Sequence, residues 1–172
     1  MNIVSTLTWE DHQQAFVAAR QLVLPMDLDP AKLNAPELEL NGWLAQILEK
    51  VEAIADQSYR GSVETARRLK DEVLALWERA QQSLGRRAQE LRTKIMDMIQ
   101  EFLRRVIDAA LSRVRPCIQV GDLTYKIVGV KVEQTIKFST SLKSSLESLI
   151  ELVSEGSLAV SADYGVAPVV TA

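Results

Sequence analysis

The chain has 172 residues, of which 47% are hydrophobic and 25% charged, and its formal net charge is -3. This composition excludes the class of weakly hydrophobic, highly charged chains that stay disordered, and it predicts a folded domain with a core. The single cysteine, Cys117, excludes an intramolecular disulfide and a zinc site built from several cysteines. Charge is polarised along the chain: residues 1–57 carry 3 basic and 9 acidic side chains, whereas residues 86–115 carry 8 basic and 4 acidic ones.

The pattern of hydrophobicity predicts neither a secretory signal nor a membrane span. The first nine residues have no basic region ahead of an apolar run, and the most apolar long stretch, residues 95–114, is interrupted by six charged side chains. A membrane-spanning helix needs about 18 or more residues with few charges. We therefore expect a cytoplasmic protein, which agrees with the use of a single cysteine.

The first predicted element is a short amphipathic helix within residues 1–34. Thr8 followed by Asp11 resembles a capping box, and apolar residues then recur at helical spacing as far as Leu24. Pro25 and Pro30, together with nearby aspartates, break this pattern. The segment after the helix is therefore predicted to be an acidic connector and a candidate hinge.

From about residue 37 to residue 114 the pattern is helical with few interruptions. Asn34 and Pro36 suit a helix start, whereas Gly61 and then Gly85 are the strongest breaks, because glycine costs about 1 kcal/mol relative to alanine inside a helix. The apolar stripe shifts its frame near residue 80 and widens after Ile95, which favours a long helical hairpin or bundle with coiled-coil-like packing over one uniform coiled coil. The pattern leaves open whether the hairpin closes within one chain or long helices pair between chains.

Beyond Pro116 the apolar period changes to two, which predicts strands. A glycine at position 121 suits a tight hairpin, and the alternation continues as far as Phe138. A helix ending at Gly156 and a last strand over residues 158–164 follow.

The predicted fold class is α+β and predominantly α. A long helical hairpin or bundle is followed by a small C-terminal β-β-β-α-β module. The predicted segments are a short helix with its connector at 1–34, the helical part at 35–115, the module at 116–164 and a tail at 165–172.

The residues that could carry chemistry form no catalytic constellation along the sequence. His12 is the only histidine and has no evident orienting partner, and Cys117 fits the start of a strand. Asp27 and Asp29 resemble the opening of a calcium loop, but Lys32 stands where that loop needs glycine. We expect no enzymatic activity, no cofactor and no metal, with an enzyme of unrecognised type as a remaining alternative.

Basic residues gather in the second half of the helical region, with a basic face formed by Arg86, Arg87, Arg104 and Arg105. Glu101 lies four residues before Arg105, an order that favours ion pairs within the helix. A solvated helix face is therefore favoured over contact with an acidic segment of another subunit or an anionic membrane surface. Nucleic acid is the least favoured partner, since aromatic residues are not interleaved with the basic ones.

The leading hypothesis is a non-enzymatic protein of the interaction or assembly class, either an oligomerising adaptor or a structural subunit, with a second copy as the expected partner. The predicted binding edge is the terminal strand at 158–164, because such a strand can pair with another chain. The alternative is a membrane-active protein that uses the amphipathic helix at 95–111. Interface candidates are apolar or aromatic residues on these predicted faces: Trp9, Phe16, Trp43, Ile95, Met98, Phe102, Leu158, Val160 and Tyr164.

Overall fold

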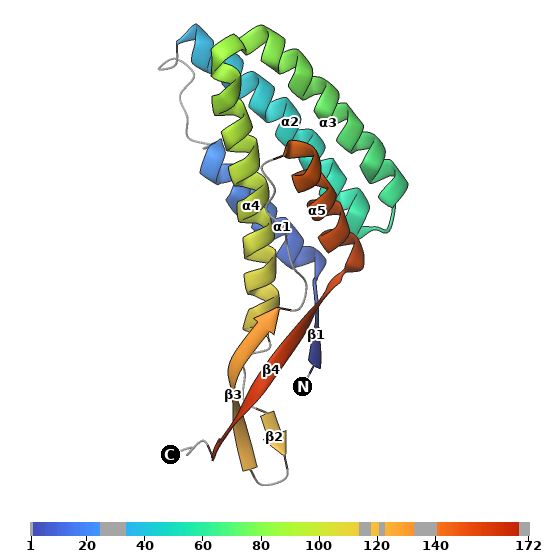
Figure 1. The fold of residues 1–172 in the computed structure, drawn as a ribbon, viewed down its shortest axis with the longest axis vertical. Helices are drawn as coiled ribbons and strands as arrows, with labels where there is room; N and C mark the ends of the chain where they lie inside the picture. The colour runs from blue at the N-terminus through green and yellow to red at the C-terminus, as the bar shows by residue number, and fades with distance from the viewer. Residues whose placement is uncertain (1, 25–33, 114–117, 121–122, 133–140, 169–172) are drawn as a thin grey trace.

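A computed structural model describes residues 2–24, 34–113, 118–120, 123–132 and 141–168, with side chains described for 4–24, 34–113 and 141–158. Within these ranges the chain forms five α-helices, one short 3-10 helix and four strands (Figure 1). In chain order they are β1 (Asn2–Thr6), α1 (Trp9–Val23), α2 (Ala35–Tyr59), α3 (Val63–Leu84), η2 (Gly85–Arg87), α4 (Ala88–Ser112), β2 (Ile118–Val120), β3 (Leu123–Val132), α5 (Leu142–Glu155) and β4 (Ser157–Pro168).

Capping side chains and glycines mark the boundaries of the first three α-helices. At the start of α1, the Thr8 side chain accepts a hydrogen bond from the backbone N–H of Asp11 and the Asp11 side chain accepts one from Thr8, forming a capping box. At the start of α2, the side chain of Asn34 accepts a hydrogen bond from the backbone N–H of Glu37. Gly61 between α2 and α3 has a φ of 84°, and Gly85 after α3 has a φ of 59°, a backbone region that glycine adopts without strain.

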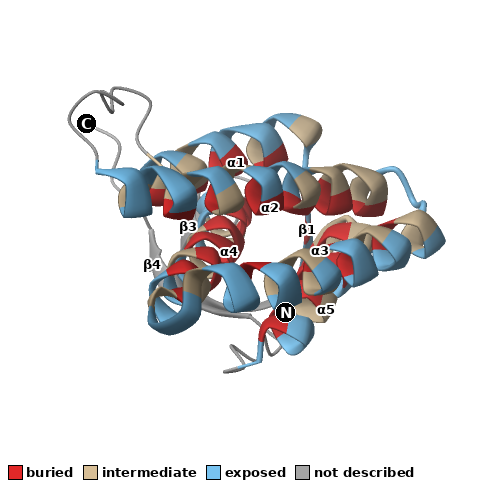
Figure 2. Cartoon of the chain, turned by 90° about the horizontal axis from the view of Figure 1, so that it is seen from above, coloured by how far each residue is buried: buried red, intermediate tan, exposed pale blue. Residues whose placement is uncertain are grey.

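The helices bury their apolar faces against one another. Helix α2 packs along α3, α1 packs along α4, and α5 lies against α2, α3 and α4. Viewed from above, the buried sides of the helices face inward and the exposed sides face solvent (Figure 2). The largest fully buried side chains come from α2, α4 and α5, and they include Leu44, Ile47, Phe102, Leu146 and Leu149.

The strands form one antiparallel sheet with the order β1-β4-β3-β2 among the described residues. Strand β1, from the start of the chain, pairs with the start of β4, from Asn2 opposite Ser161 to Thr6 opposite Ser157. On its other side β4 pairs with β3, from Val160 onward. The sheet extends from one end of the helical bundle, so that β2 and the far ends of β3 and β4 lie away from the helices (Figure 1).

The prediction of a mainly helical chain with a small sheet is confirmed. The sequence prediction missed β1. The predicted third strand of the module continues the alternation from Val128 to Phe138, and its first part is the end of β3, as far as Val132. The rest of that strand and most of the connector lie outside the described residues. The division into segments stays a prediction, although contacts cross it: β1 pairs with β4, and α5 packs into the helical bundle. None of the described helices combines the length and the apolar character needed to cross a membrane.

Candidate functional site: the outer edge of strand β1

Strand β1 is one of the two outermost strands of the sheet, and within the described residues nothing pairs with it on the side away from β4. Its sequence, NIVST, contains no charged residue and no proline. Val4 is 67% exposed, the highest value among the exposed large hydrophobic residues of the described chain. Edge strands of natural proteins usually carry charges, prolines or bulges that prevent pairing with another chain. The residues of β1 themselves, Asn2–Thr6, include none of these protective features.

The strand is held firmly on its inner side. Ser5 is buried, and its hydroxyl donates a hydrogen bond of 2.9 Å to the carbonyl oxygen of Ala110 near the end of α4. Leu7 is also buried, and its backbone N–H donates to the carbonyl oxygen of Gly156, at 2.8 Å, just before β4. The exposed edge is therefore presented by a strand that the sheet and the helical bundle fix in place.

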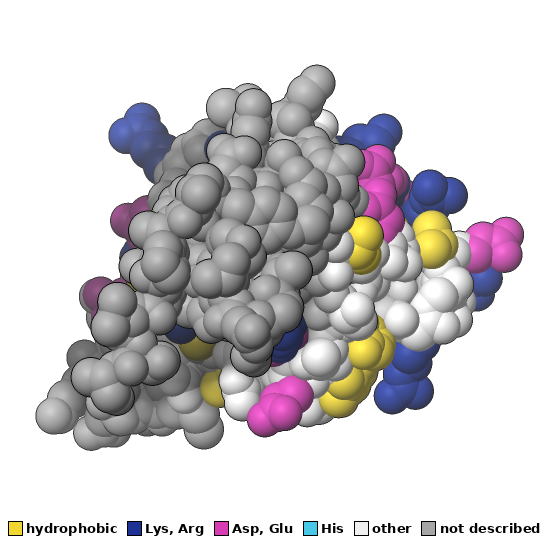
Figure 3. Space-filling model, turned by 90° about the horizontal axis from the view of Figure 1, so that it is seen from below, with side chains coloured by type: hydrophobic (Ala, Val, Ile, Leu, Met, Phe, Trp, Pro, Cys, Tyr) yellow, Lys and Arg dark blue, Asp and Glu magenta, His cyan; other side chains and the backbone are white. Residues whose placement is uncertain are grey.

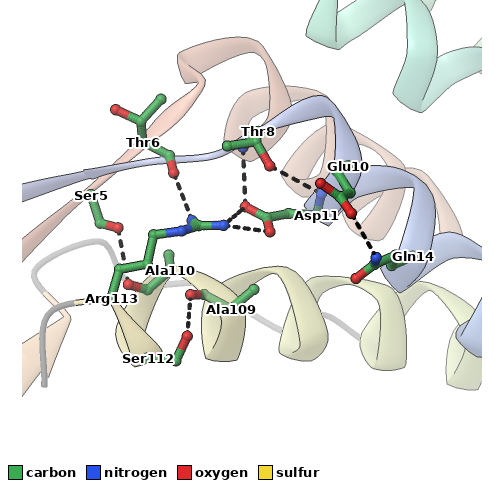
Figure 4. A network of polar contacts seen from close by, with 10 residues as sticks. All are labelled: Ser5, Thr6, Thr8, Glu10, Asp11, Gln14, Ala109, Ala110, Ser112 and Arg113. Atoms are coloured by element: carbon green, nitrogen blue, oxygen red, sulfur yellow. Dashed lines mark hydrogen bonds and ion pairs between the residues drawn. The ribbon is translucent and has the colours of Figure 1, made fainter. Parts of the chain in front are cut away.

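Arg113, directly after α4, joins β1 to α1 and α4 (Figure 4). Its Nη1 atom donates a 3.0 Å hydrogen bond to the carbonyl oxygen of Thr6, and its Nη2 atom donates to both carboxylate oxygens of Asp11. The Asp11 Oδ2 atom also accepts from the Thr8 backbone N–H at 3.1 Å. One guanidinium group thus fixes the end of β1 relative to the first turn of α1.

The charge of Asp11 is stabilised by these contacts. Burial opposes its ionisation, but the hydrogen bonds from Arg113 and Thr8 and the positive charge of Arg113 outweigh burial and hold the pKa of Asp11 below its ordinary value. The carboxylate is therefore ionised at neutral pH and remains paired with Arg113.

His12 lies at the junction of α1, α2 and α4. Its side chain is buried, with Nε2 at 2.8 Å from Oδ1 of Asp56 on α2. The imidazole stacks on Trp9 with ring centroids 5.0 Å apart, and Phe102 meets it edge-on at 5.5 Å. The Nδ1 atom is buried and has no hydrogen-bond partner among the described residues.

Sequence reasoning found no orienting partner for His12, because Asp56 lies 44 positions further along the chain. A carboxylate bonded to an imidazole is an arrangement that enzymes use to orient a base. Here, however, the ring is enclosed by aromatic side chains and connects three helices, so that its contacts are those of a packing residue.

Two shallow pockets lie side by side along α1 and α4 and share Arg104 and Asp108. Their volumes are about 400 Å³ and 340 Å³. Both mix acidic, basic and amide groups, and neither is lined by His12. The remaining lining residues are Leu22, Asp97, Gln100, Glu101 and Ile107 in the larger pocket, and Asp11, Gln14, Ala15, Arg105 and Ala109 in the smaller one.

Most of the predicted interface residues are part of the core of this chain. Five of the nine candidates are buried, so in this conformation they offer no surface to a partner: Phe16, Ile95, Met98, Phe102 and Leu158. The apolar face of residues 95–111 is thus packed inside the bundle in this conformation.

The other predicted interface residues differ in their surroundings. Trp9 and Trp43 are half-buried, and Arg60 lies over the Trp9 ring at 5.4 Å from its centroid. The side chains of Val160 and Tyr164 lie outside the described residues. Strand β4 lies between β1 and β3 in the sheet, and both strands pair with it at Val160 and Ser161, so the edge predicted at 158–164 is not free at these two residues.

The predicted basic face lies on the surface, and three of its four arginines form ion pairs with glutamates three or four residues away. Arg87 pairs with Glu90 at 2.9 Å, and Arg105 pairs with Glu101 at 2.8 Å. Arg104 also binds Glu101, and Arg86 is exposed. Hydrogen bonds from Arg104 outweigh burial and, with those from Arg105, lower the pKa of Glu101. Contacts of this kind are typical of a solvated helix face.

No protein-family model, curated protein or solved structure matches this chain. Function is therefore inferred from the geometry of its own residues. On the face of the molecule seen from below, the described apolar side chains form small, separate patches among charged ones (Figure 3). The outer edge of β1 differs from these patches because it offers backbone hydrogen-bonding groups beside an exposed valine.

Proposed function

We propose that this protein is a non-enzymatic interaction and assembly protein that associates with other copies of itself by binding one of their strands along the outer edge of β1. The observation that carries the proposal is the combination of an uncharged, proline-free edge strand with Val4 at 67% exposure. An added strand would satisfy the free backbone groups of the edge and cover Val4, which is how strand addition obtains its affinity. The helical bundle would act as the scaffold that holds this edge.

The distribution of apolar surface supports this reading. Residues that could have formed a helical interface, such as Met98 and Phe102, are fully buried within the chain. Strand β1, in contrast, is fixed by Ser5 and Leu7, and no strand pairs with its outer side within the described residues, where Arg113 binds only the Thr6 end. A pre-ordered strand binds with less loss of conformational entropy than a flexible one.

Light scattering coupled to size exclusion, over a wide range of protein concentration, tests the proposal. We expect the wild-type chain to exceed its protomer mass of 19.2 kDa at high concentration. The Val4→Lys variant should remain at the protomer mass, because a lysine on an edge strand opposes pairing with another chain.

Val17→Lys is the matched control, because Val17 is also exposed, at 55%, but lies on α1. It adds the same charge to the same residue type away from the sheet, and should associate like the wild type. A wild-type chain that stays at the protomer mass at every concentration would contradict the proposal. Equal loss of association in both variants would also contradict it, since the effect would then come from charge alone.

A further inference from the structure

The hydrogen bonds of β1 show which of its backbone groups face outward. In an antiparallel pair, alternate residues direct their N–H and C=O groups toward the neighbouring strand. The Leu7 N–H donates to Gly156, beside β4, whereas the Thr6 carbonyl oxygen faces away and accepts from Arg113. By this alternation, the backbone groups of Val4 and Asn2 also face away from β4.

Arg113 limits the length of the free edge. Its guanidinium donates a hydrogen bond to the Thr6 carbonyl oxygen, and its ion pair with Asp11 holds the guanidinium in that position. An added strand would have to displace this ion pair to use Thr6. In the part of the chain that the structure describes, the outward backbone groups left without a partner are therefore those of Asn2 and Val4, two donors and two acceptors.

We propose that the strand bound at this edge is β1 of a second copy of the chain, antiparallel, with the twofold axis at Ile3. This inference rests on the proposed function and names the bound strand and its register. The axis places Asn2 of each copy opposite Val4 of the other, and each of these two pairs exchanges both of its hydrogen bonds. A register centred on Val4 would instead require Thr6, which Arg113 occupies.

The chemistry of the edge fits a second copy. The strand carries no charged side chain, and the two described charged side chains at its Thr6 end, Arg113 and Asp11, pair with each other, so two identical edges bring no unpaired like charges together from these side chains. The twofold axis keeps equivalent residues on the same face of the joined sheet. The exposed Val4 side chains of the two copies thus become diagonal neighbours across the new strand pair and shield each other from water.

Pairing through one five-residue strand is a small interface, below the roughly 1,200 Å² of stable complexes. The dimer is therefore expected to dissociate on dilution. The two copies would form one continuous sheet, with the two helical bundles at opposite ends of the shared strand pair.

A charge-rescue experiment tests the register. Val4→Lys should weaken dimerisation about tenfold or more, whereas Val4→Lys combined with Asn2→Glu should recover most of this loss. In the proposed register each introduced glutamate faces the lysine of the other copy, twice per dimer. The matched control combines Val4→Lys with Asn2→Lys, which places like charges opposite each other and should stay at the protomer mass. Sedimentation equilibrium gives the dissociation constants, and circular dichroism checks that each variant is folded.

The outcomes separate this inference from the proposed function. Rescue by Asn2→Glu, but not by Asn2→Lys, supports the twofold pairing. An assembly that Val4→Lys disrupts and Asn2→Glu does not restore, or one that grows beyond two copies, overturns this pairing and leaves strand addition at β1 standing. A wild-type chain that is monomeric at all concentrations overturns both.

Discussion

The helical bundle and the sheet differ in how much of their apolar surface is exposed to solvent. In the bundle, the long apolar stripes of α2, α4 and α5 are covered by neighbouring helices, and side chains such as Leu44, Phe102 and Leu149 have no exposed surface. In the sheet, β1 exposes Val4 and leaves its outer side without a strand in the described residues. We propose from this contrast that the bundle supplies stability and that the sheet supplies the surface for a partner.

Shortening a large side chain at the centre of the bundle should have the largest effect on the free energy of unfolding. Phe102 is fully buried and contacts the rings of His12 and Phe16 at centroid distances of 5.5 and 5.9 Å. We expect Phe102→Ala to lower the free energy of unfolding by about 3–5 kcal/mol, from lost apolar contact and the cavity left behind. Urea unfolding followed by circular dichroism measures the change.

The control for this change is Leu22→Ala, because Leu22 is 61% exposed on α1. We expect it to alter stability by less than about 0.5 kcal/mol. Similar losses in the two variants would show that the bundle is not the well-packed region described above.

The stability that the junction between bundle and sheet contributes should depend on pH. The pKa of Asp11 is lowered in the folded protein, so the unfolded chain binds a proton more readily and the contribution of Asp11 to stability is lost as pH falls below about 4. We expect Asp11→Asn to cost about 1 kcal/mol at pH 7 and less at pH 3, because it removes the charge that pairs with Arg113.

Urea unfolding of both proteins between pH 7 and pH 3 tests this expectation. The pKa of Glu101 is lowered as well, but its contribution is common to both proteins and cancels in their difference. A difference between wild type and variant that stays constant over this range would mean that the pair of Asp11 and Arg113 does not stabilise the junction.

The smallest effects on stability are expected at two glycines, one inside α2 and one directly after it. Gly42 lies inside α2, where an added Cβ would meet no atom within 4 Å, so Gly42→Ala should stabilise the protein by about 0.5–1 kcal/mol. Gly61 has equally free space but a φ of 84°, and Gly61→Ala should destabilise by about 1 kcal/mol. Thermal unfolding of the two variants compares them, and shifts of the same sign would argue against the turn between α2 and α3.

Local signals in the sequence predicted the local structure well. The capping box at Thr8 and Asp11 and the breaks at Gly61 and Gly85 lie at helix boundaries, because each depends on a few neighbouring residues. Strand β1 was missed because its five residues become a strand only by pairing with β4, near the other end of the chain. Such pairing leaves little trace in a short segment.

Long-range contacts also explain what the sequence could not show about the site. An apolar stripe looks the same whether a helix of the same chain or of another chain covers it, so Ile95 and Met98 were predicted as interface candidates and lie in the core. Likewise, Arg113 lies in the stretch 86–115 where basic residues outnumber acidic ones, and only the fold brings it to Asp11 and to the carbonyl oxygen of Thr6.

Amide hydrogen exchange, measured by NMR at low and at high protein concentration, compares the two regions most directly. The Val4 N–H faces outward from the sheet, whereas the amides of α4 are enclosed in the bundle. We expect exchange at Val4 to slow markedly as concentration rises, while exchange in α4 stays slow at both concentrations. Exchange at Val4 that is independent of concentration would contradict assembly through the edge of β1.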